Sequence, residues 1–184
     1  MERLILLCSR NANKLRELSA VGWELELLDA DGYPAEGEES YVENARAKAL
    51  YGREVGPADA WMLGEDSGLE VVALDGGPGV RSARYGSEGG GAIERLLREL
   101  DGVEDRRARY VCELVLIGPD GRELRGSGEL KGRIAGEPRG SEGFGYDPVF
   151  LPGGEERTVA ELGNEWKSHN SHRARAAADL GAKL

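Results

Sequence analysis

Apolar and polar residues follow one another along this chain in blocks that predict strands and helices in turn. Continuous apolar or alternating runs are typical of strands, and apolar positions three or four residues apart are typical of helices. The predicted strands are Leu4–Cys8, Glu24–Leu28, Ala60–Gly64, Leu69–Ala73, Arg109–Ile117 and Glu123–Ile134. The predicted helices run from about Asn13 to Val21, Ser40 to Glu54, Gly91 to Leu100 and His172 to Leu184.

Two kinds of connection decide the type of sheet. The opening strand, helix and strand form a unit that favours parallel pairing. Between the last two strands, Gly118-Pro119-Asp120-Gly121 is a turn signal, which predicts an antiparallel hairpin. A chain with both signals is expected to be α/β or α+β, with helices flanking a mixed sheet. No repeat or low-complexity linker divides the 184 residues, so we expect a single domain over residues 1–184.

Composition narrows the classes of partner. A formal net charge of −10 disfavours nonspecific binding to nucleic acid or anionic membranes, because the summed field repels polyanions. Cys8 and Cys112 lie in apolar runs without C-x-x-C spacing, so we expect buried thiols rather than a disulfide framework or a zinc site. The apolar run after Met1 is too short for a signal peptide, and no later run reaches membrane-spanning length. We therefore expect a cytoplasmic protein.

The segment Gly64-Glu65-Asp66-Ser67-Gly68-Leu69 places two adjacent carboxylates where a short apolar run meets small residues. Carboxylates inside a buried strand carry a desolvation cost of several kcal/mol. We therefore expect this pair at a strand end, open to a cleft, where it can hold a hard cation or accept a proton from water. The alternative is a polar turn between two strands.

A second candidate lies between the first strand and the first helix, over Ser9-Arg10-Asn11-Ala12-Asn13-Lys14. Free N–H groups and the positive dipole end at a helix start favour an anion, and Lys14 lies one turn into the helix. The Walker triplet Gly-Lys-Ser/Thr is absent. The alternative is ordinary capping by Asn11 or Asn13.

Glu43 is a third candidate. Ser40-Tyr41-Val42-Glu43 has the form of a capping box, in which the glutamate satisfies backbone N–H groups and needs no ligand. If that helix packs near Asp66, Glu43 and Asp66 can instead share one Mg²⁺, with phosphate oxygens and waters completing the shell.

Two further segments suit a planar, oxygen-bearing ligand. Phe144-Gly145-Tyr146-Asp147-Pro148 carries aromatic rings on a flexible backbone, which suits stacking on a base, although these rings can equally pack a loop onto the core. Lys167, His172 and Arg173 belong to a basic cluster that offers donors to oxyanions or carbonyls. The alternative for that cluster is a solvated helix entry.

Together these segments resemble the non-canonical purine nucleoside triphosphate pyrophosphatases, also called ITP/XTP pyrophosphatases. The resemblance covers nearly the whole chain, with the motifs in order. They are Ser9-x-Asn11-x-x-Lys14, Tyr41-Val42-Glu43-Asn44-Ala45, Glu65-Asp66-Ser67-Gly68-Leu69, Gly77-x-Gly79-x-x-Ser82-Ala83-Arg84-Tyr85, Gly143-Phe144-Gly145-Tyr146-Asp147-Pro148-Val149-Phe150, and Lys167 with Ser171-His172-Arg173.

The resemblance implies a homodimeric hydrolase with an elongated mixed sheet and two lobes around a central nucleotide cleft. It implies cleavage of ITP, dITP or XTP into the monophosphate and pyrophosphate, which removes non-canonical purines from the nucleotide pool. It implies that Asp66 accepts a proton, that Glu43 and Asp66 hold Mg²⁺, and that Lys14 assists catalysis. The implied phosphate-binding residues are Ser9, Arg10, Asn11, Ala12, Asn13, Lys14 and Ser67. The implied nucleoside-binding residues are Phe144, Gly145, Tyr146, Asp147, Lys167, His172 and Arg173.

Two departures and two competing interpretations accompany the resemblance. Arg10 stands where the family usually has glycine, and Glu65 stands where bacterial relatives often have aspartate, which leaves Glu65 as an additional candidate metal ligand. A Maf-like nucleotide pyrophosphatase shares the reaction but prefers other bases. A catalytically silent nucleotide-binding protein of the same fold is the other alternative, although it would be expected to lose Lys14, Glu43 or Asp66.

Overall fold

The computed structural model describes residues 4–19, 22–38, 40–86 and 91–184, in which seven strands form one mixed sheet in the order β2-β1-β3-β5-β6-β7, with β4 paired to β3. The strands are β1 (Ile5–Leu7), β2 (Leu25–Leu27), β3 (Trp61–Val71), β4 (Pro78–Gly79), β5 (Arg107–Ile117), β6 (Glu123–Ile134) and β7 (Phe150–Pro152). The helices are α1 (Ala12–Ser19), α2 (Tyr41–Val55), α3 (Ala92–Glu99), α4 (Val159–Asn170) and α5 (His172–Gly181), with short 3₁₀ turns η1 (Val72–Leu74), η2 (Ser82–Arg84) and η3 (Asp147–Val149).

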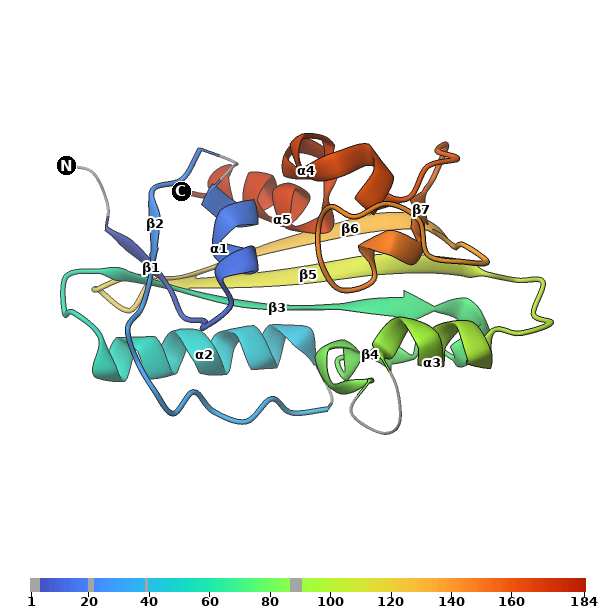
Figure 1. Ribbon diagram of the computed structural model, residues 1–184. Helices are drawn as coiled ribbons and strands as arrows, with labels where there is room; N and C mark the ends of the chain where they lie inside the picture. Colours follow the sequence, from blue (N-terminus) through green and yellow to red (C-terminus); the bar gives the residue numbers. More distant parts are fainter. Residues whose placement is uncertain (1–3, 20–21, 39, 87–90) are drawn as a thin grey trace.

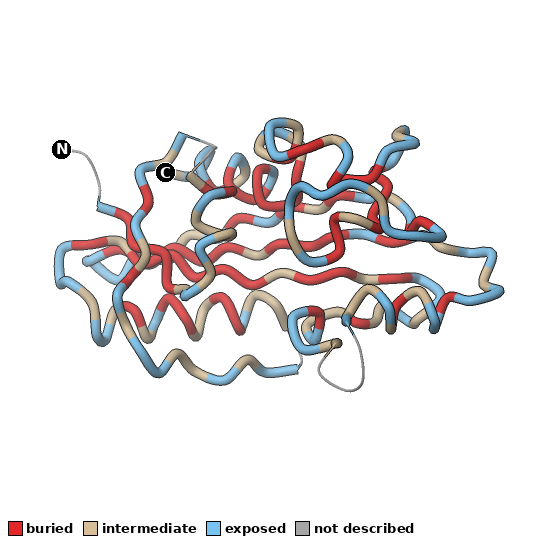
Figure 2. The backbone as a smooth tube through the Cα atoms, in the orientation of Figure 1, coloured by how far each residue is buried: buried red, intermediate tan, exposed pale blue. Residues whose placement is uncertain are grey.

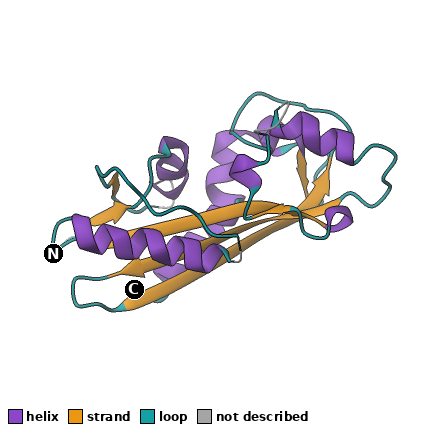
Figure 3. Ribbon diagram, turned by 90° about the horizontal axis from the view of Figure 1, so that it is seen from below, coloured by secondary structure: helices purple, strands orange, loops and turns teal. Residues whose placement is uncertain are grey.

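The sheet combines both pairing modes that the sequence predicts. β1 pairs in parallel with β2 and β3, whereas β3, β5, β6 and β7 follow one another antiparallel. The long strands β3, β5 and β6 run the length of an elongated molecule, with α2 on one face and α1, α4 and α5 on the other (Figures 1 and 3). The expected fold class, a mixed sheet with flanking helices, is confirmed.

The two largest clusters of buried apolar residues lie towards opposite ends of the long strands. Figure 2 shows that buried segments also continue along these strands. One cluster joins β1, α1, α5 and the sheet, and it includes Leu7, Leu18, Leu114 and Leu180. The other joins α3, β7 and the far half of the sheet, and it includes Leu96, Leu100, Leu130 and Phe150. This two-ended core gives the molecule two lobes that share the same long strands.

The main error in the sequence prediction concerns β3. The predicted strands Ala60–Gly64 and Leu69–Ala73 are one continuous strand, Trp61–Val71, and the glycines and charges between them do not break it. The carboxylates Glu65 and Asp66 therefore lie in mid-strand, not at a strand end or in a polar turn.

Other boundaries agree closely, and one α-helix, two strands and the 3₁₀ turns among the described residues were not predicted. β6 covers the predicted residues, while α1 begins one residue early, and its predicted end at Val21 lies outside the described residues. α4, β7 and the short β4 had no counterpart in the prediction. No helix among the described residues is long and apolar enough to cross a bilayer.

Close packing of α2 on β3 depends on Gly64. A Cβ at this position would lie 1.8 Å from the carbonyl oxygen of Ala45, so only glycine lets the helix backbone rest on the strand. Ala45 and Ala49 are fully buried and complete the contact. The helix is thereby held directly above the strand that bears Asp66.

We expect Gly64→Ala to lower the free energy of unfolding by about 3 kcal/mol or more, because the added methyl group overlaps helix backbone that cannot rotate away. Urea denaturation followed by circular dichroism measures the change. Gly136→Ala is the matched control, since a Cβ there meets nothing within 4 Å. Equal stability of both variants would show that α2 does not need this close approach.

Candidate active site

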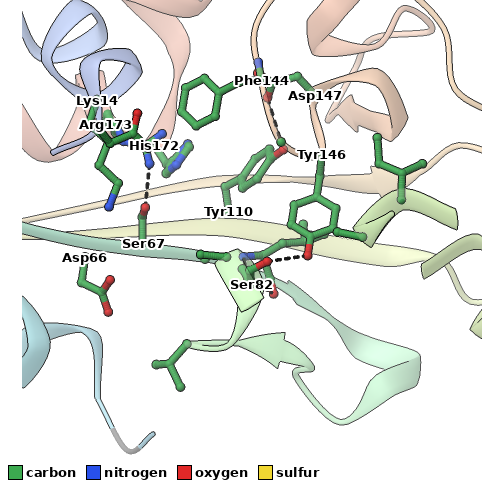
Figure 4. A pocket seen from close by; sticks show the side chains of 18 of the residues that line it. Lys14, Asp66, Ser67, Ser82, Tyr110, Phe144, Tyr146, Asp147, His172 and Arg173 are labelled. Carbon is green, nitrogen blue, oxygen red and sulfur yellow. Dashed lines mark hydrogen bonds between the residues drawn. The ribbon is translucent and has the colours of Figure 1, made fainter. Parts of the chain in front are cut away.

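The candidate site opens at an interruption in strand pairing along β3. β1 pairs with Trp61–Leu63 and β4 pairs with Leu69–Glu70, and no described strand pairs with that edge in between. A cavity of about 620 Å³ opens at this gap between the two lobes (Figure 4). Its lining residues are Asn11, Lys14, Glu36, Asp66, Ser67, Gly68, Leu69, Val80, Ser82, Ala83, Gly91, Ala92, Ile93, Glu94, Tyr110, Pro138, Phe144, Gly145, Tyr146, Asp147, Lys167, His172 and Arg173.

Strand geometry sends the two adjacent carboxylates to opposite faces of the sheet, because successive side chains on a strand point in opposite directions. Glu65 contacts α1 and α5, whereas Asp66 contacts α2. The residues are 0% and 3% exposed, respectively. The expectation that both open into a cleft is therefore wrong for Glu65, which does not line the cavity, and holds only for Asp66.

Glu65 is compensated by two cations. Lys14 Nζ lies 2.5 Å from its Oε2, and Arg173 Nε lies 3.0 Å from its Oε1. Burial alone would raise the pKa of Glu65, but Lys14, Arg173 and the nearby Lys48 together hold that pKa well below its usual range. This carboxylate is thus a buried counter-ion whose oxygens face Lys14 and Arg173.

Asp66 has a different environment, built by α2. Asn44 Nδ2 donates to its Oδ2 at 2.9 Å, and Lys48 Nζ lies 3.3 Å from its Oδ1. Burial raises the pKa of Asp66, partly offset by Lys48 and Asn44. A carboxylate with a raised pKa that faces a cavity is suited to accept a proton.

Lys48 also contacts a carboxylate that sequence reasoning missed. Its Nζ lies 2.5 Å from Oε1 of Glu36, which lines the cavity on the loop before α2. Asn44 anchors the same loop, because its Oδ1 accepts from Gly37 N at 2.7 Å and its Nδ2 donates to Gly37 O at 3.1 Å. The four-residue spacing of Asn44 and Lys48 within an alanine-rich helix was the available sequence signal; nothing distinguished Glu36 from its acidic neighbours.

Glu43 lies apart from this group. Its side chain is exposed in the first turn of α2 and is not among the cavity-lining residues. Ser40 caps the helix by accepting from Glu43 N at 3.4 Å, which is the serine half of the expected capping box. The carboxylate that the structure brings beside Asp66 is Glu36.

The loop from Ser9 to Lys14 holds itself in place through local hydrogen bonds. Ser9 Oγ accepts from Asn11 N at 3.1 Å, and Asn11 Oδ1 accepts from Asn13 N at 2.9 Å. Arg10 is exposed and does not line the cavity, whereas Asn11 and Lys14 do. Local hydrogen bonding by Asn11 and a cavity-lining Lys14 therefore occur together in this loop.

At the other end of the cavity, Asp147 organises the aromatic loop. Its buried carboxylate accepts from Phe144 N at 2.8 Å and from Tyr110 OH at 3.2 Å, and it lies 2.5 Å from Lys167 Nζ. Lys167 Nζ in turn lies 4.1 Å from the centre of the Phe144 ring. On the opposite wall, Tyr146 OH donates to Ser82 O at 2.8 Å.

Ser67 and Arg173 connect the two ends. Arg173 Nη2 donates to Ser67 Oγ at 2.7 Å, while its Nε and Nη1 donate to Glu65 and Glu17. A guanidinium has more N–H groups than these three, so Arg173 retains donors for a ligand.

Of the four acidic residues that line the cavity, Glu36, Asp66, Glu94 and Asp147, the first two share Lys48 as an ion-pair partner. Among the described residues, no group of three or more His, Cys, Asp or Glu side chains is placed to hold a metal ion. Lys48 already places positive charge between the two acids. Since Mg²⁺ is usually held by one or two carboxylates together with substrate phosphates, this donor set fits Mg²⁺ only when a nucleotide supplies the remaining oxygens.

His172 is buried and stacks on Tyr110, with ring centroids 4.6 Å apart. Burial, with Arg173 and Lys167 nearby, holds the pKa of His172 well below its usual value, so the imidazole is neutral at pH 7. His172 therefore offers one N–H donor rather than a positive charge.

We expect His172 to make the protein less stable in mild acid. The unfolded chain protonates this histidine near pH ~6.5 and the folded chain does not, so the free energy of unfolding falls below that pH, by up to about 1.4 kcal/mol per pH unit. His172→Gln should reduce this slope in urea titrations between pH 5 and 7. His169→Gln, at the exposed histidine, should not, and identical slopes in both variants would contradict a neutral, buried His172.

The chain is similar to several known proteins in sequence and in structure. It matches the model of the Ham1 family over residues 5–183. It is 43% identical to the dITP/XTP pyrophosphatase of Gloeobacter violaceus, over 98% of this chain and 93% of the relative. The solved structure of the Staphylococcus aureus Ham1 protein matches with a TM-score of 0.82 at 32% identity, covering 99% of this chain and 100% of that one. A dITP/XTP pyrophosphatase structure from Mycobacterium abscessus matches with a TM-score of 0.73 at 41% identity, covering 98% and 97%. These matches confirm the resemblance seen in the motifs, and the chain belongs to the Ham1 family.

Proposed function

We propose that this protein is a Mg²⁺-dependent nucleoside triphosphate pyrophosphatase that converts dITP, ITP and XTP into the monophosphate and pyrophosphate. One observation carries the proposal: a single cavity holds a carboxylate pair at one end, an aromatic and cationic site at the other, and Lys14 on its wall. The relatives named dITP/XTP pyrophosphatase support the substrate class.

The nucleobase fits the end formed by Phe144, Lys167 and Arg173. An aromatic ring provides a stacking surface, and the cations provide donors for the 6-keto oxygen of hypoxanthine or xanthine. Adenine carries an amino group at that position, so donor would meet donor. A buried mismatch of this kind costs about 1–3 kcal/mol, which disfavours ATP.

The triphosphate fits along Lys14 and the start of α1, where Asn11 also faces the cavity. Lys14 supplies positive charge locally, which a protein with a net charge of −10 needs in order to bind a polyanion. The neighbouring Ser67 hydroxyl lies on the same wall.

In the reaction, Asp66 orients the attacking water and accepts its proton. Asn44 and Lys48 hold the two oxygens of Asp66 in a fixed orientation, so the acceptor is positioned before the substrate arrives. Glu36 and Asp66 would hold Mg²⁺. When bound, this ion would neutralise negative charge on the triphosphate and on the leaving pyrophosphate. Glu43, which the sequence interpretation assigned to the metal, is replaced by Glu36 in this proposal.

We propose in addition that the protein acts in the cytoplasm as a homodimer. The family resemblance supports the dimer, and the free, buried thiols of Cys8 and Cys112 support a reducing compartment. Light scattering on the purified protein tests the dimer.

We expect the wild-type protein to release pyrophosphate, and not orthophosphate, from dITP in the presence of Mg²⁺. Asp66→Asn should lower kcat by at least about 10²-fold while nucleotide binding is retained, because the amide cannot accept the proton. Product chromatography and calorimetric titration with the monophosphate measure the two effects. Orthophosphate release, or faster turnover of dTTP or UTP than of ITP, would overturn the proposal.

A matched pair of variants tests the metal ligands. Glu36→Gln should raise the Mg²⁺ concentration needed for half-maximal rate by about tenfold or more, because a charged carboxylate beside Asp66 becomes a neutral amide. Glu43→Gln, at an exposed position in the first turn of α2 that does not line the cavity, should change this concentration less than about twofold. The reverse ranking would restore Glu43 as the metal ligand and remove Glu36.

A further inference from the structure

Buried charges of alternating sign run from the phosphate end of the cavity to the nucleobase end. The series begins with the Lys14–Glu65 and Glu65–Arg173 pairs and ends with the Lys167–Asp147 pair. One carboxylate, Glu17, joins the two halves of this series.

Glu17 lies on α1, three residues after Lys14, and is only 9% exposed. Its Oε1 lies 2.5 Å from Lys167 Nζ, and its Oε2 lies 3.1 Å from Arg173 Nη1. It is not among the cavity-lining residues, so it does not face the ligand itself. A buried carboxylate that pairs two cations from two other helices acts on the ligand only through those cations.

Lys167 and Arg173 both lie at the nucleobase end of the cavity, and Glu17 is the negative charge that pairs with both. Both lie over the same ring, Lys167 Nζ at 4.1 Å and Arg173 Cζ at 5.2 Å from the Phe144 centroid. Like charges repel one another strongly when they are buried, and the Lys167 and Arg173 side chains are only 4% and 5% exposed. Asp147 and Glu65 each compensate one of the cations, whereas Glu17 compensates both and fixes their separation.

We propose that Glu17 is a positioning residue for base selectivity: it holds Lys167 and Arg173 where their remaining N–H groups meet a 6-keto oxygen, and it ties them to the helix that carries Lys14. This inference rests on the proposed function and deepens it. Loss of the Glu17 charge lets the cations separate, so a keto purine loses donors that adenine never used.

The test is the ratio of kcat/KM for ITP to kcat/KM for ATP, measured for wild type and Glu17→Gln. The glutamine keeps the size and removes the charge, and we expect the ratio to fall by about tenfold or more. Inhibition by inorganic triphosphate, which has no base, should change less than about threefold. A ratio of two rates on one preparation does not depend on the fraction of protein that is folded.

Glu123→Gln is the matched control. Glu123 also pairs with two cations, Arg46 and Arg125, but on β6 and with a side chain 24% exposed. We expect its ITP to ATP ratio to equal that of wild type. Glu17→Asp keeps the charge on a shorter side chain, so its ITP to ATP ratio should lie between those of Glu17→Gln and wild type. If Glu17→Gln does not fold, the comparison of Glu17→Asp with wild type gives the same test.

The outcomes separate the inference from the function on which it rests. An unchanged ratio with equal losses on ITP, ATP and inorganic triphosphate would make Glu17 a structural residue and overturn the inference. A wild-type protein that does not hydrolyse ITP would instead overturn the proposed function.

Discussion

The site depends on the burial of one charge, the carboxylate of Glu65, in the middle of a central strand. An ionised carboxylate removed from water costs several kcal/mol unless it is paired and hydrogen-bonded. Lys14 and Arg173 meet that requirement, and they come from α1 and α5. The charge on β3 therefore determines where both helices pack, and with them the wall of the cavity. Removing one partner of such a pair typically costs about 3–5 kcal/mol, so the arrangement is strongly constrained.

The alternation of side chains along a strand gives neighbouring acids different tasks. Glu65 faces α1 and α5 and forms ion pairs with Lys14 and Arg173, which keep its pKa low. Asp66 faces α2, and burial raises its pKa. The close approach of α2 at Gly64 places Asn44 and Lys48 against Asp66. A carboxylate that anchors the fold and a carboxylate available for chemistry thus occupy consecutive positions, and their ion pairs are made with different cations, Lys14 and Arg173 for Glu65 and Lys48 for Asp66.

Much of the fold follows from local signals in the sequence. The hairpin of β5 and β6 and the amphipathic helices were predicted because period and turn chemistry are local properties. α4 was missed because Gly163, at φ 89°, interrupts its helical pattern, although Thr158 and Glu161 form a capping box that was available as a signal. The continuity of β3 could not be seen, because the residues that compensate Glu65 and Asp66 are distant in sequence.

The candidate site, too, could be predicted only where its signals are local in the sequence. The motifs identified Lys14, Asp66, Phe144 and Arg173, and the structure brings all four to one cavity. Glu36 and Lys48 were missed because their contacts exist only after α2 packs on β3. Glu43 was favoured for its place in a motif, and the helix turns it towards solvent.

The carboxyl group of Glu65 is ionised inside the protein and is held by cations from two helices. Carbon-13 NMR of glutamate side-chain carboxyls, with Glu65 assigned through the Glu65→Gln variant, tests it directly across a pH titration. We expect the Glu65 signal to stay at the position of an ionised carboxylate throughout the pH range in which the protein is folded. A titration of that signal at or above the ordinary glutamate pKa would contradict it.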